Sequence, residues 1–434
     1  MPDTPHRPAA PDGIVLFNVK YSPNLGDGVI AACLEHGLAA RLPGTRVASI
    51  DLAGREAWLP PGDGRGRVRL LRTLQALPAP LRDGAVGLAL GLRLRRRLVP
   101  AWRRAARGAG FAVFGGGQLI QDGDLNFPLK LSAAIGLCHA LAMPVAVYGV
   151  GASPSRSTLG GHLLRRLLAS PRLVHLSARD AASRDSLAGY RPSQPVDLAR
   201  DPGLLAAGLW PAAAKPGRAR PLIGVGITHP APLHHHGAGL ARETDADAAE
   251  RYGRLVDGLV AQGLDVALFT NGAAEDEDFL TAHAARLCAA AGGDGRVARL
   301  PRAADPAALA RRVAGLDGLV AHRLHAIILA YAYRVPAIGL RWDAKLDAFL
   351  RSVDAADRAA DFDDASVGEI PARLAEAMRA GVDPVRHASV VGETEGALDR
   401  LAEVIAAARA LGRTRTGRTA DLPHGTALGL PARP

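Results

Sequence analysis

The sequence contains few cysteines, few aromatic residues and no long apolar run. The three cysteines, Cys33, Cys138 and Cys288, form neither a CxxC pair nor a disulfide framework, which fits a reducing cytosol. Aromatic residues make up only 4% of the chain, so leucine, alanine and valine must form the hydrophobic cores. The apolar run at residues 84–92, next to a basic cluster, is much shorter than the roughly 20 residues that span a bilayer. We therefore expect a chain that is not integral to a membrane.

The N-terminal residues 1–12 are polar and rich in proline, without the charged start and apolar stretch of a secretory signal. We expect them to be disordered and the protein to be cytoplasmic. Cysteine, histidine and carboxylate residues do not recur at the spacing of a metal site, so we expect neither a metal nor another cofactor.

The chain carries a net charge of +11, from 53 lysines and arginines against 42 aspartates and glutamates. Such an excess favours contact with polyanions. The densest basic block lies between Arg65 and Arg107. Two interpretations of this block stay open: basic amphipathic helices that dock peripherally on the inner membrane, or an ordinary solvated surface. Nucleic acid is not an expected partner, because the chain shows neither a recognised nucleic-acid module nor a pattern of aromatic residues interleaved with basic ones.

The length of 434 residues fits two domains better than one core. Short apolar runs alternate with helical periodicity, which predicts parallel sheets with right-handed crossovers. Strands are expected at 13–19, 46–51, 111–114, 145–150, 173–177 and 196–198, and again at 222–227, 265–270, 296–300, 318–321 and 335–340. We expect an N-terminal Rossmann-like domain at 13–208 with a basic helical insertion at 57–110, a linker at 209–221, a C-terminal Rossmann-like domain at 222–411 and a disordered tail at 412–434. The predicted fold class is α/β, with the two domains facing across a cleft.

Two polar clusters follow strands of the first domain, where open parallel sheets bind their ligands. Asn24 and Asp27 follow the first strand, and they either cap the next helix or contact a ligand. Arg179 and Asp180 follow the strand at 173–177. Arg179 suits a carboxylate or a phosphate, but the two residues could equally form a structural ion pair.

A third cluster follows the strand at 111–114. Its glycines Gly115, Gly116 and Gly117 expose backbone amides that could approach an anion, and Gln118 and Asp122 crowd the same loop. The glycines match neither GxGxxG nor a P-loop, so they are weak support for a nucleotide.

The segment His322, Arg323, Leu324 and His325 joins the strand at 318–321 to the following helix. A helix N-terminus attracts anions, Arg323 adds a fixed cation, and His325 can carry a proton near neutral pH. We predict that the chemistry takes place here, against the alternative that both histidines only pack.

Two further clusters have simpler interpretations. His234, His235 and His236 are adjacent and cannot easily face one ion, so a solvated loop is the better interpretation. The acidic run Glu275 to Asp278 opens a helix, and a favourable interaction with the helix dipole accounts for it.

Taken in order, the motifs resemble the polysaccharide pyruvyltransferase family over about residues 14 to 350. The resemblance rests on Asn24 to Asp27, Gly115 to Gly117, Tyr148 to Gly151, Ala178 to Asp180, Asp201-Pro202, His322 to Ile327 and Val335 to Lys345. It implies a two-domain fold similar to GT-B glycosyltransferases and transfer of pyruvate from phosphoenolpyruvate onto a sugar diol as a cyclic ketal. The partners it implies are phosphoenolpyruvate, as co-substrate, and a glycan or lipid-linked saccharide acceptor.

The resemblance also implies roles for individual residues. The catalytic residues fall on His325, the family's catalytic histidine, and on Arg323. The donor-binding arginines fall on Arg323 and Arg179, with Leu324 beside them. The loop Gly115 to Gly117 is carried over as a donor contact. Residues of the acceptor side or the cleft are expected among Asn24, Asp27, Gln118, Asp122, His322, Asp343 and Lys345.

Two other functions stay open from the sequence. One is a GT-B-type glycosyltransferase that uses a nucleotide sugar. The other is a basic, non-enzymatic binder of membranes or nucleic acid, whose binding would fall steeply with salt and survive His325→Ala.

Overall fold

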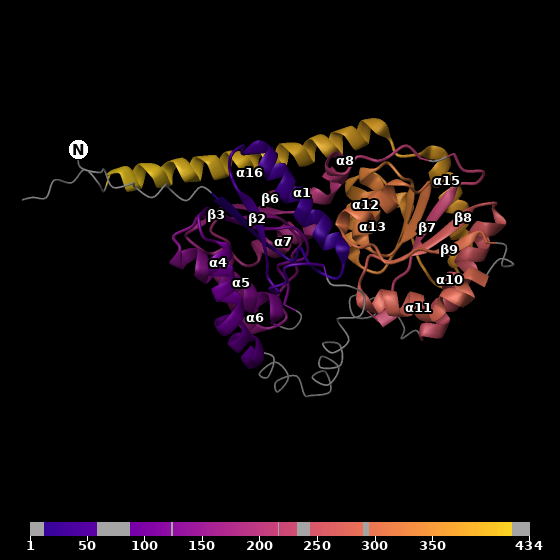
Figure 1. The fold of residues 1–434 in the computed structure, drawn as a ribbon, viewed down its shortest axis with the longest axis horizontal. Helices are drawn as coiled ribbons and strands as arrows, with labels where there is room; N and C mark the ends of the chain where they lie inside the picture. Colours follow the sequence, from indigo (N-terminus) through magenta and orange to yellow (C-terminus); the bar gives the residue numbers. More distant parts are fainter. Residues whose placement is uncertain are drawn as a thin grey trace, which may run out of the picture.

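The computed structural model describes residues 13–58, 87–122, 125–215, 217–231, 244–289 and 295–418. The expected disordered N-terminus, the first part of the basic block, the three adjacent histidines and the end of the tail lie outside these residues. The described chain forms two α/β domains and a long helix that joins them (Figure 1).

The first domain is built on a six-stranded sheet in which every neighbouring pair of strands is parallel. Its order is β2-β1-β3-β4-β5-β6, with β1 (Gly13–Asn18), β2 (Val47–Asp51), β3 (Ala109–Gly115), β4 (Val145–Val150), β5 (Leu173–Ala178) and β6 (Asp197–Leu198). All residues of β1 and β4 are buried, as their continuous apolar runs predict. The described helical segments are α1 (Leu25–Arg41), η1 (Leu94–Leu98), α4 (Val99–Ala105), α5 (Asn126–Ala140), α6 (Thr158–Leu168), α7 (Ala181–Ala188), η2 (Pro202–Leu205) and α8 (Ala206–Leu209).

The second domain repeats this architecture. Its sheet has the order β12-β11-β10-β7-β8-β9, again with parallel pairs, and consists of β7 (Leu222–Gly226), β8 (Asp265–Phe269), β9 (Val297–Arg299), β10 (Gly318–Ala321), β11 (Ala337–Leu340) and β12 (Ala359–Ala360). The described helices are α10 (Asp245–Ala261), α11 (Ala274–Ala289), α12 (Pro306–Ala314), α13 (Leu324–Ala332), α14 (Ala344–Ser352), α15 (Ile370–Ala380) and the short turns η4 (Ala356–Arg358) and η5 (Val367–Glu369). Two parallel-sheet domains confirm the expected α/β class.

The strand orders say where ligands can bind. In the first sheet the chain winds outward in opposite directions from β1 and β3, and in the second sheet from β7 and β10. Open α/β sheets bind ligands beyond the carboxyl ends of the strands at such switch points. The segments that leave β1, β3 and β10 carry Asn24, Gln118 and His325, so the topology brings the predicted clusters to these points.

The basic segment before β3 contributes to the core of the first domain. Residues 87–93 are helical and continue into η1 and α4, which connect β2 to β3. Leu94, Leu98 and Trp102 are buried in the core on one face of the sheet. The described part of the expected insertion is therefore the crossover that parallel strands require, since such strands cannot be joined by a tight turn. Its arginines lie on the exposed side of the helix.

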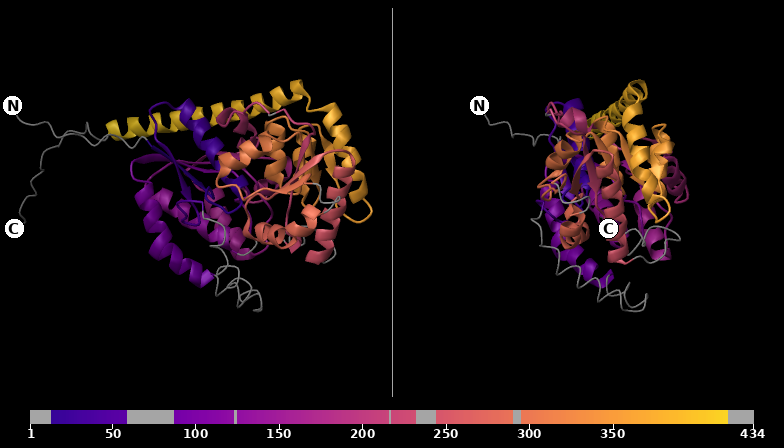
Figure 2. Two further views of the ribbon diagram at one scale, coloured as in Figure 1. Left: turned by 45° about the vertical axis from the view of Figure 1, so that its right-hand side comes forward. Right: turned by 90° about the vertical axis from the view of Figure 1, so that its right-hand side faces the viewer.

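The long helix α16 (Pro384–Arg418) crosses from the second domain back to the first (Figures 1 and 2). Leu398, Leu401 and Ile405 are buried against β1 and α1, and Arg41 pairs with Glu395 and Asp399. The sequence assigned residues up to 411 to the second domain and placed a disordered tail after them. The structure instead extends the helix to Arg418. Leu398, Leu401 and Ile405 pack on the first domain, whereas Val390, nearer the start of the helix, packs against Ile328 and Tyr331 of the second.

The two domains share a hydrophobic core through α1. Leu25, Val29 and Cys33 of this helix pack in one cluster with Phe269, Leu309 and Ile327 of the second domain. The backbone N–H of Leu25 also donates to the carbonyl oxygen of Asn271, at 2.8 Å. Helix α1 is therefore fixed to the second domain at its first turn. Among the described helices, none is both long and apolar enough to cross a bilayer.

Candidate active site

A cavity of about 150 Å³ lies between the two domains at the switch points. Its walls are formed by residues of both domains, namely Asn24, Asp27, Gln118, Arg179, Arg323, Leu324, His325, Trp342, Asp343, Lys345 and Leu346. The volume is about five times the roughly 30 Å³ that one water molecule occupies in the liquid. The cavity therefore has the size of a small molecule.

Three helices begin at this cavity. The side chain of Asn24 caps α1 by accepting from the N–H of Gly26 at 3.3 Å, and Asp343 caps α14 by accepting from the N–H of Lys345 at 3.1 Å. Helix α13 starts at Leu324, directly after Arg323. Helix N-termini carry partial positive charge and free amides, so their convergence favours an anion. Asn24 therefore caps α1 and also lines the cavity.

Arg179 enters the cavity from the first domain, and its side chain is only 6% exposed. Its Nη2 donates to Oε1 of Gln118 at 3.1 Å, and its guanidinium lies 3.4 Å from Asp180 and 3.8 Å from Asp201. A side chain at Gly151 would collide with both Gln118 and Arg179, at 2.2 and 2.9 Å. Gly151 thus allows Gln118 to orient the guanidinium.

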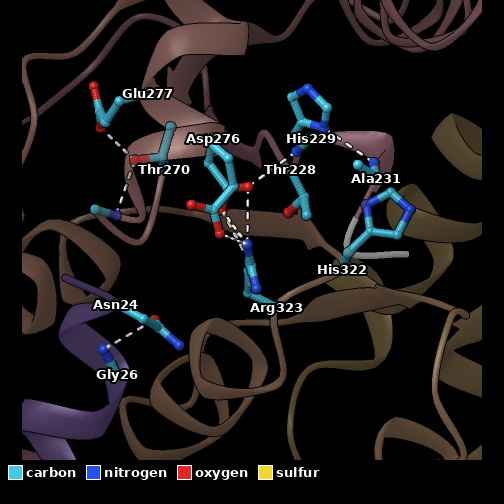
Figure 3. A network of polar contacts seen from close by, with 12 residues as sticks. Asn24, Gly26, Thr228, His229, Ala231, Thr270, Asp276, Glu277, His322 and Arg323 are labelled. Atoms are coloured by element: carbon cyan, nitrogen blue, oxygen red, sulfur yellow. Dashed lines mark hydrogen bonds and ion pairs between the residues drawn. The ribbon is translucent and has the colours of Figure 1, made fainter. Parts of the chain in front are cut away.

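Arg323 is held more tightly. Its Nε and Nη2 donate to the two carboxylate oxygens of Asp276 at 2.9 and 2.8 Å, and Figure 3 shows the two side chains pointing toward each other. Asp276 is fully buried and also accepts from the N–H of His229 at 3.0 Å. Burial raises the pKa of Asp276 to about 6, against the lowering effect of Arg323. The guanidinium keeps its charge, since the buried carboxylate raises the pKa of Arg323.

His325 faces the first turn of α1. Its Nδ1 lies 4.0 Å from Oδ1 of Asp27. Its Nε2 is buried and has no hydrogen-bond partner among the described residues. Burial lowers the pKa of His325 to about 3, helped by the positive charges of Arg179, Arg323 and Lys345. His325 is thus a neutral imidazole with one unsatisfied nitrogen.

Three groups of predicted site residues do not line the cavity. Gly116 and Gly117 have φ of 77 and 76°, and a side chain at Gly115 or Gly116 would collide with Leu34 or Ile30 of α1. The glycines let the end of β3 approach α1, so their placement favours packing over the expected donor contact. Gln118 is the residue of this loop that reaches the cavity.

Asp122 stabilises the start of α6 instead of lining the cavity. Its Oδ2 accepts from the hydroxyl of Ser155 at 2.7 Å and from the N–H of Ser157 at 2.8 Å. These hydrogen bonds lower its pKa despite its burial. The sequence placed Asp122 in the cleft because it is close to Gln118, but the chain turns away between the two residues.

His322 is only 1% exposed and packs behind the cavity. Its Nδ1 is 3.0 Å from the hydroxyl of Tyr252, its carbonyl accepts from Nε1 of Trp342 at 2.7 Å, and its ring packs edge-on against Phe362. Burial lowers its pKa to about 3. Of the two histidines in the motif, one therefore packs and the other lines the cavity.

The sequence missed Asp276 as part of the site. The acidic run was explained by the helix dipole alone, yet one of its carboxylates is buried against Arg323. The helical spacing of α11 could have indicated that Asp276 is buried, because this residue precedes the buried Phe279 and Leu280 by one helical turn. Among the residues that the structure describes, no three histidine, cysteine, aspartate or glutamate side chains are grouped so that they could hold a metal ion.

Known proteins are similar to this chain in sequence motifs and in fold. The model of the polysaccharide pyruvyl transferase family matches residues 24–344. Among solved structures, α,α-trehalose 6-phosphate synthase from Burkholderia multivorans is 13% identical, with a TM-score of 0.50 over 96% of this chain and 99% of the other. A putative UDP-N-acetylglucosamine 2-epimerase from Listeria monocytogenes is 8% identical, with a TM-score of 0.48 over 88% and 90%. No curated protein matches the sequence. At this identity the structural likeness concerns the fold alone, which is GT-B-like.

Proposed function

This chain belongs to the polysaccharide pyruvyl transferase family, and from that membership we propose that it transfers pyruvate from phosphoenolpyruvate onto a sugar diol of a polysaccharide or glycan precursor. The product is a cyclic ketal. The single observation that carries the proposal is the interdomain cavity, in which three cationic side chains, a neutral histidine and three helix N-termini converge.

The cavity suits the charge of phosphoenolpyruvate, which carries a carboxylate and a phosphate. Arg179 offers a planar fork for one of the two groups, and Lys345 offers a compact cation. The helix N-termini supply amide donors for the remaining oxygens. Arg323 contributes its positive charge, while its Nε and Nη2 donate to Asp276. Donor binding is thus assigned to Arg179, Lys345 and the start of α13 at Leu324.

The chemistry needs proton carriers rather than a metal or another cofactor. Protonation of the methylene carbon makes the adjacent carbon electrophilic, and a sugar hydroxyl attacks it. Phosphate then leaves and the second hydroxyl closes the ketal. Of the two hydroxyl protons released, one ends on the methyl group and the other on phosphate. Neutral His325 is suited to accept a hydroxyl proton as the new C–O bond forms.

We further propose that the enzyme acts at the surface of an anionic membrane, where a lipid-linked acceptor would reside. Leu88 and Leu92 lie one helical turn apart and are 68% and 45% exposed. Beside them, an open groove of about 600 Å³ is lined by apolar residues with arginines among them, namely Leu94, Val99, Pro100, Leu129 and Leu163 with Arg95, Arg103 and Arg166. Apolar side chains among arginines match the chemistry of an anionic bilayer surface.

Sedimentation with vesicles tests the membrane proposal. Vesicles containing anionic lipid should bind the protein, and purely neutral vesicles should not. Leu88→Glu with Leu92→Glu should abolish binding, whereas Val385→Glu, at another exposed apolar residue, should leave it intact. Equal binding of the double variant and the wild type would reject this surface.

Product analysis tests the transfer itself. The protein is mixed with phosphoenolpyruvate and candidate glycans, and mass spectrometry is used to detect a pyruvyl ketal together with released phosphate. His325→Ala and Arg179→Ala should abolish the product while the melting temperature is retained. Release of a nucleoside diphosphate from a sugar nucleotide, without ketal formation, would instead identify a glycosyltransferase.

A further inference from the structure

We propose that Asp27 of the first domain is a catalytic proton carrier and that it works with His325 of the second domain. Each domain then supplies one half of an acid–base pair. The inference rests on the proposed pyruvyl transfer and assigns its second proton-carrying group. Both side chains line the cavity, so either can reach a bound donor.

The close approach of α1 to the start of α13 brings Asp27 next to His325. Helix α1 approaches His325 so closely that a side chain at Gly26 would lie 2.4 Å from Cβ and Nδ1 of the imidazole. The N–H of Leu25, bonded to the carbonyl of Asn271, fixes this turn on the second domain. The carboxylate of Asp27, on the same turn, lies 4.0 Å from Nδ1 of His325. This separation is only about 1 Å longer than a hydrogen bond between these atoms.

Burial, together with the positive charges around His325, keeps its imidazole neutral in the absence of a donor. Arg179 faces it from the β5–α7 loop, Arg323 precedes it on its own segment, and Lys345 faces it from α14. Asp27 of α1 is the acidic group opposite. The N-terminus of α1 adds further positive potential on this side.

The pKa of Asp27 is shifted in the direction opposite to that of His325. Burial raises its pKa to about 6, although the hydroxyl of Ser22 and the charges of Arg55, Arg323 and Arg179 oppose the shift. Near neutral pH a proton is therefore held more readily by the carboxyl group than by the imidazole. The usual order of the aspartate and histidine pKa values is therefore reversed, so the site holds an acid and a base at the same time.

This pair can complete the proton balance of the reaction. Asp27 gives its proton to the methylene carbon, whose π electrons form the new C–H bond. A hydroxyl oxygen attacks the adjacent carbon as its proton passes to His325. The C–O bond to phosphate breaks with its electron pair, and phosphate takes the proton from His325. The second hydroxyl then closes the ketal and returns its proton to Asp27, so both groups are restored.

The variant Asp27→Asn tests the role, since it keeps the shape of the side chain but cannot carry the proton. We expect kcat to fall about 100-fold or more, as for the loss of a general acid, with little change in KM for phosphoenolpyruvate. In the wild type, kcat/KM should fall above a pKa near 6, and this basic limb should be absent from the residual activity of the variant. Asp343→Asn, which removes another carboxylate of the cavity, should keep the limb.

A second readout is independent of turnover. Carbon NMR of labelled aspartate carboxyl groups should show one resonance, absent in Asp27→Asn, that titrates near pH 6. Wild-type kcat in the variant, a retained basic limb or titration of Asp27 in the usual aspartate range would overturn the proposal. If the wild type forms no ketal with any acceptor, the proposed function fails, and the NMR titration still decides whether Asp27 holds the proton.

Discussion

The two walls of the cavity hold their arginines differently. Arg179, on the first domain, is oriented by a hydrogen bond that it donates to the neutral Gln118. Its guanidinium lies 3.4 Å from the carboxylate of Asp180 and 3.8 Å from that of Asp201. Arg323, on the second domain, makes two short hydrogen bonds to the fully buried Asp276. Two nitrogens of Arg323 are thus bonded directly to a buried carboxylate, whereas Arg179 is held by longer contacts shared among three side chains. Under the proposed function, the first wall binds the donor and the second fixes the loop that carries His325.

The largest expected effect concerns the second wall. Asp276→Asn removes the partner of a buried guanidinium, and breaking such a pair costs about 3–5 kcal/mol. We expect the free energy of unfolding, measured by urea denaturation, to fall by about this amount. Asp278→Asn, an exposed carboxylate on the same helix, should have almost no effect. Unchanged stability of the Asp276 variant would remove the distinction between the walls.

On the first wall we expect a small effect on stability and a specific effect on binding of the donor. Arg179→Gln should raise KM for phosphoenolpyruvate at least about 30-fold, which corresponds to about 2 kcal/mol, because a desolvated charged contact to the donor is lost. The melting temperature should change little. Arg184→Gln, on the exposed face of α7, is the matched control. Steady-state kinetics that give the same KM for both variants would assign donor binding elsewhere.

The pH dependence of stability tests the buried, neutral state of His322. Burial lowers the pKa of His322 from 6.5 in the unfolded chain to about 3 in the folded protein. The unfolded state then binds the proton first, so stability is complete above pH 6.5 and falls by up to about 1.4 kcal/mol per unit as the pH drops toward 3. His322→Gln should flatten this slope, measured by denaturation between pH 7 and 4. It should not remove the slope entirely, since His325 contributes with the same sign. Exposed His162 provides the control, and an unchanged slope in His322→Gln would contradict the buried neutral state.

The smallest effect is expected at Asp122. Asp122→Asn weakens its hydrogen bonds to the start of α6 and should cost about 1 kcal/mol of stability. Because Asp122 does not line the cavity, kcat and KM should stay at wild-type values, in contrast to Asp27→Asn. A change in KM for the donor would instead indicate that Asp122 acts in the cleft.

Most of the fold could be predicted because strand runs are short, apolar and bounded by turn residues. The expected strands at 145–150 and 318–321 match β4 and β10 to the residue. Strand ends also located the cluster at Arg323 and His325, because carboxyl ends of parallel strands meet at one edge of a sheet.

What could not be predicted depends on contacts between distant segments. Asp276 and Arg323 are 47 residues apart, and no local pattern pairs them. His322 and His325 share one motif, but the turn between β10 and α13 sends one ring into the core and the other into the cavity. The crossover of α16 could not be predicted, because the spacing of its apolar residues does not indicate which domain the helix packs on.

That crossover has a consequence for how the second domain is attached. The chain enters this domain through the segment after α8 and leaves it before α16, in which Leu398, Leu401 and Ile405 pack on the first domain. The second domain is thus a continuous insert in the chain, joined to the first domain at both of its ends. A side chain at Gly26 would already lie 2.4 Å from the imidazole of His325, so any widening of the cavity between the domains would also part Asp27 from His325.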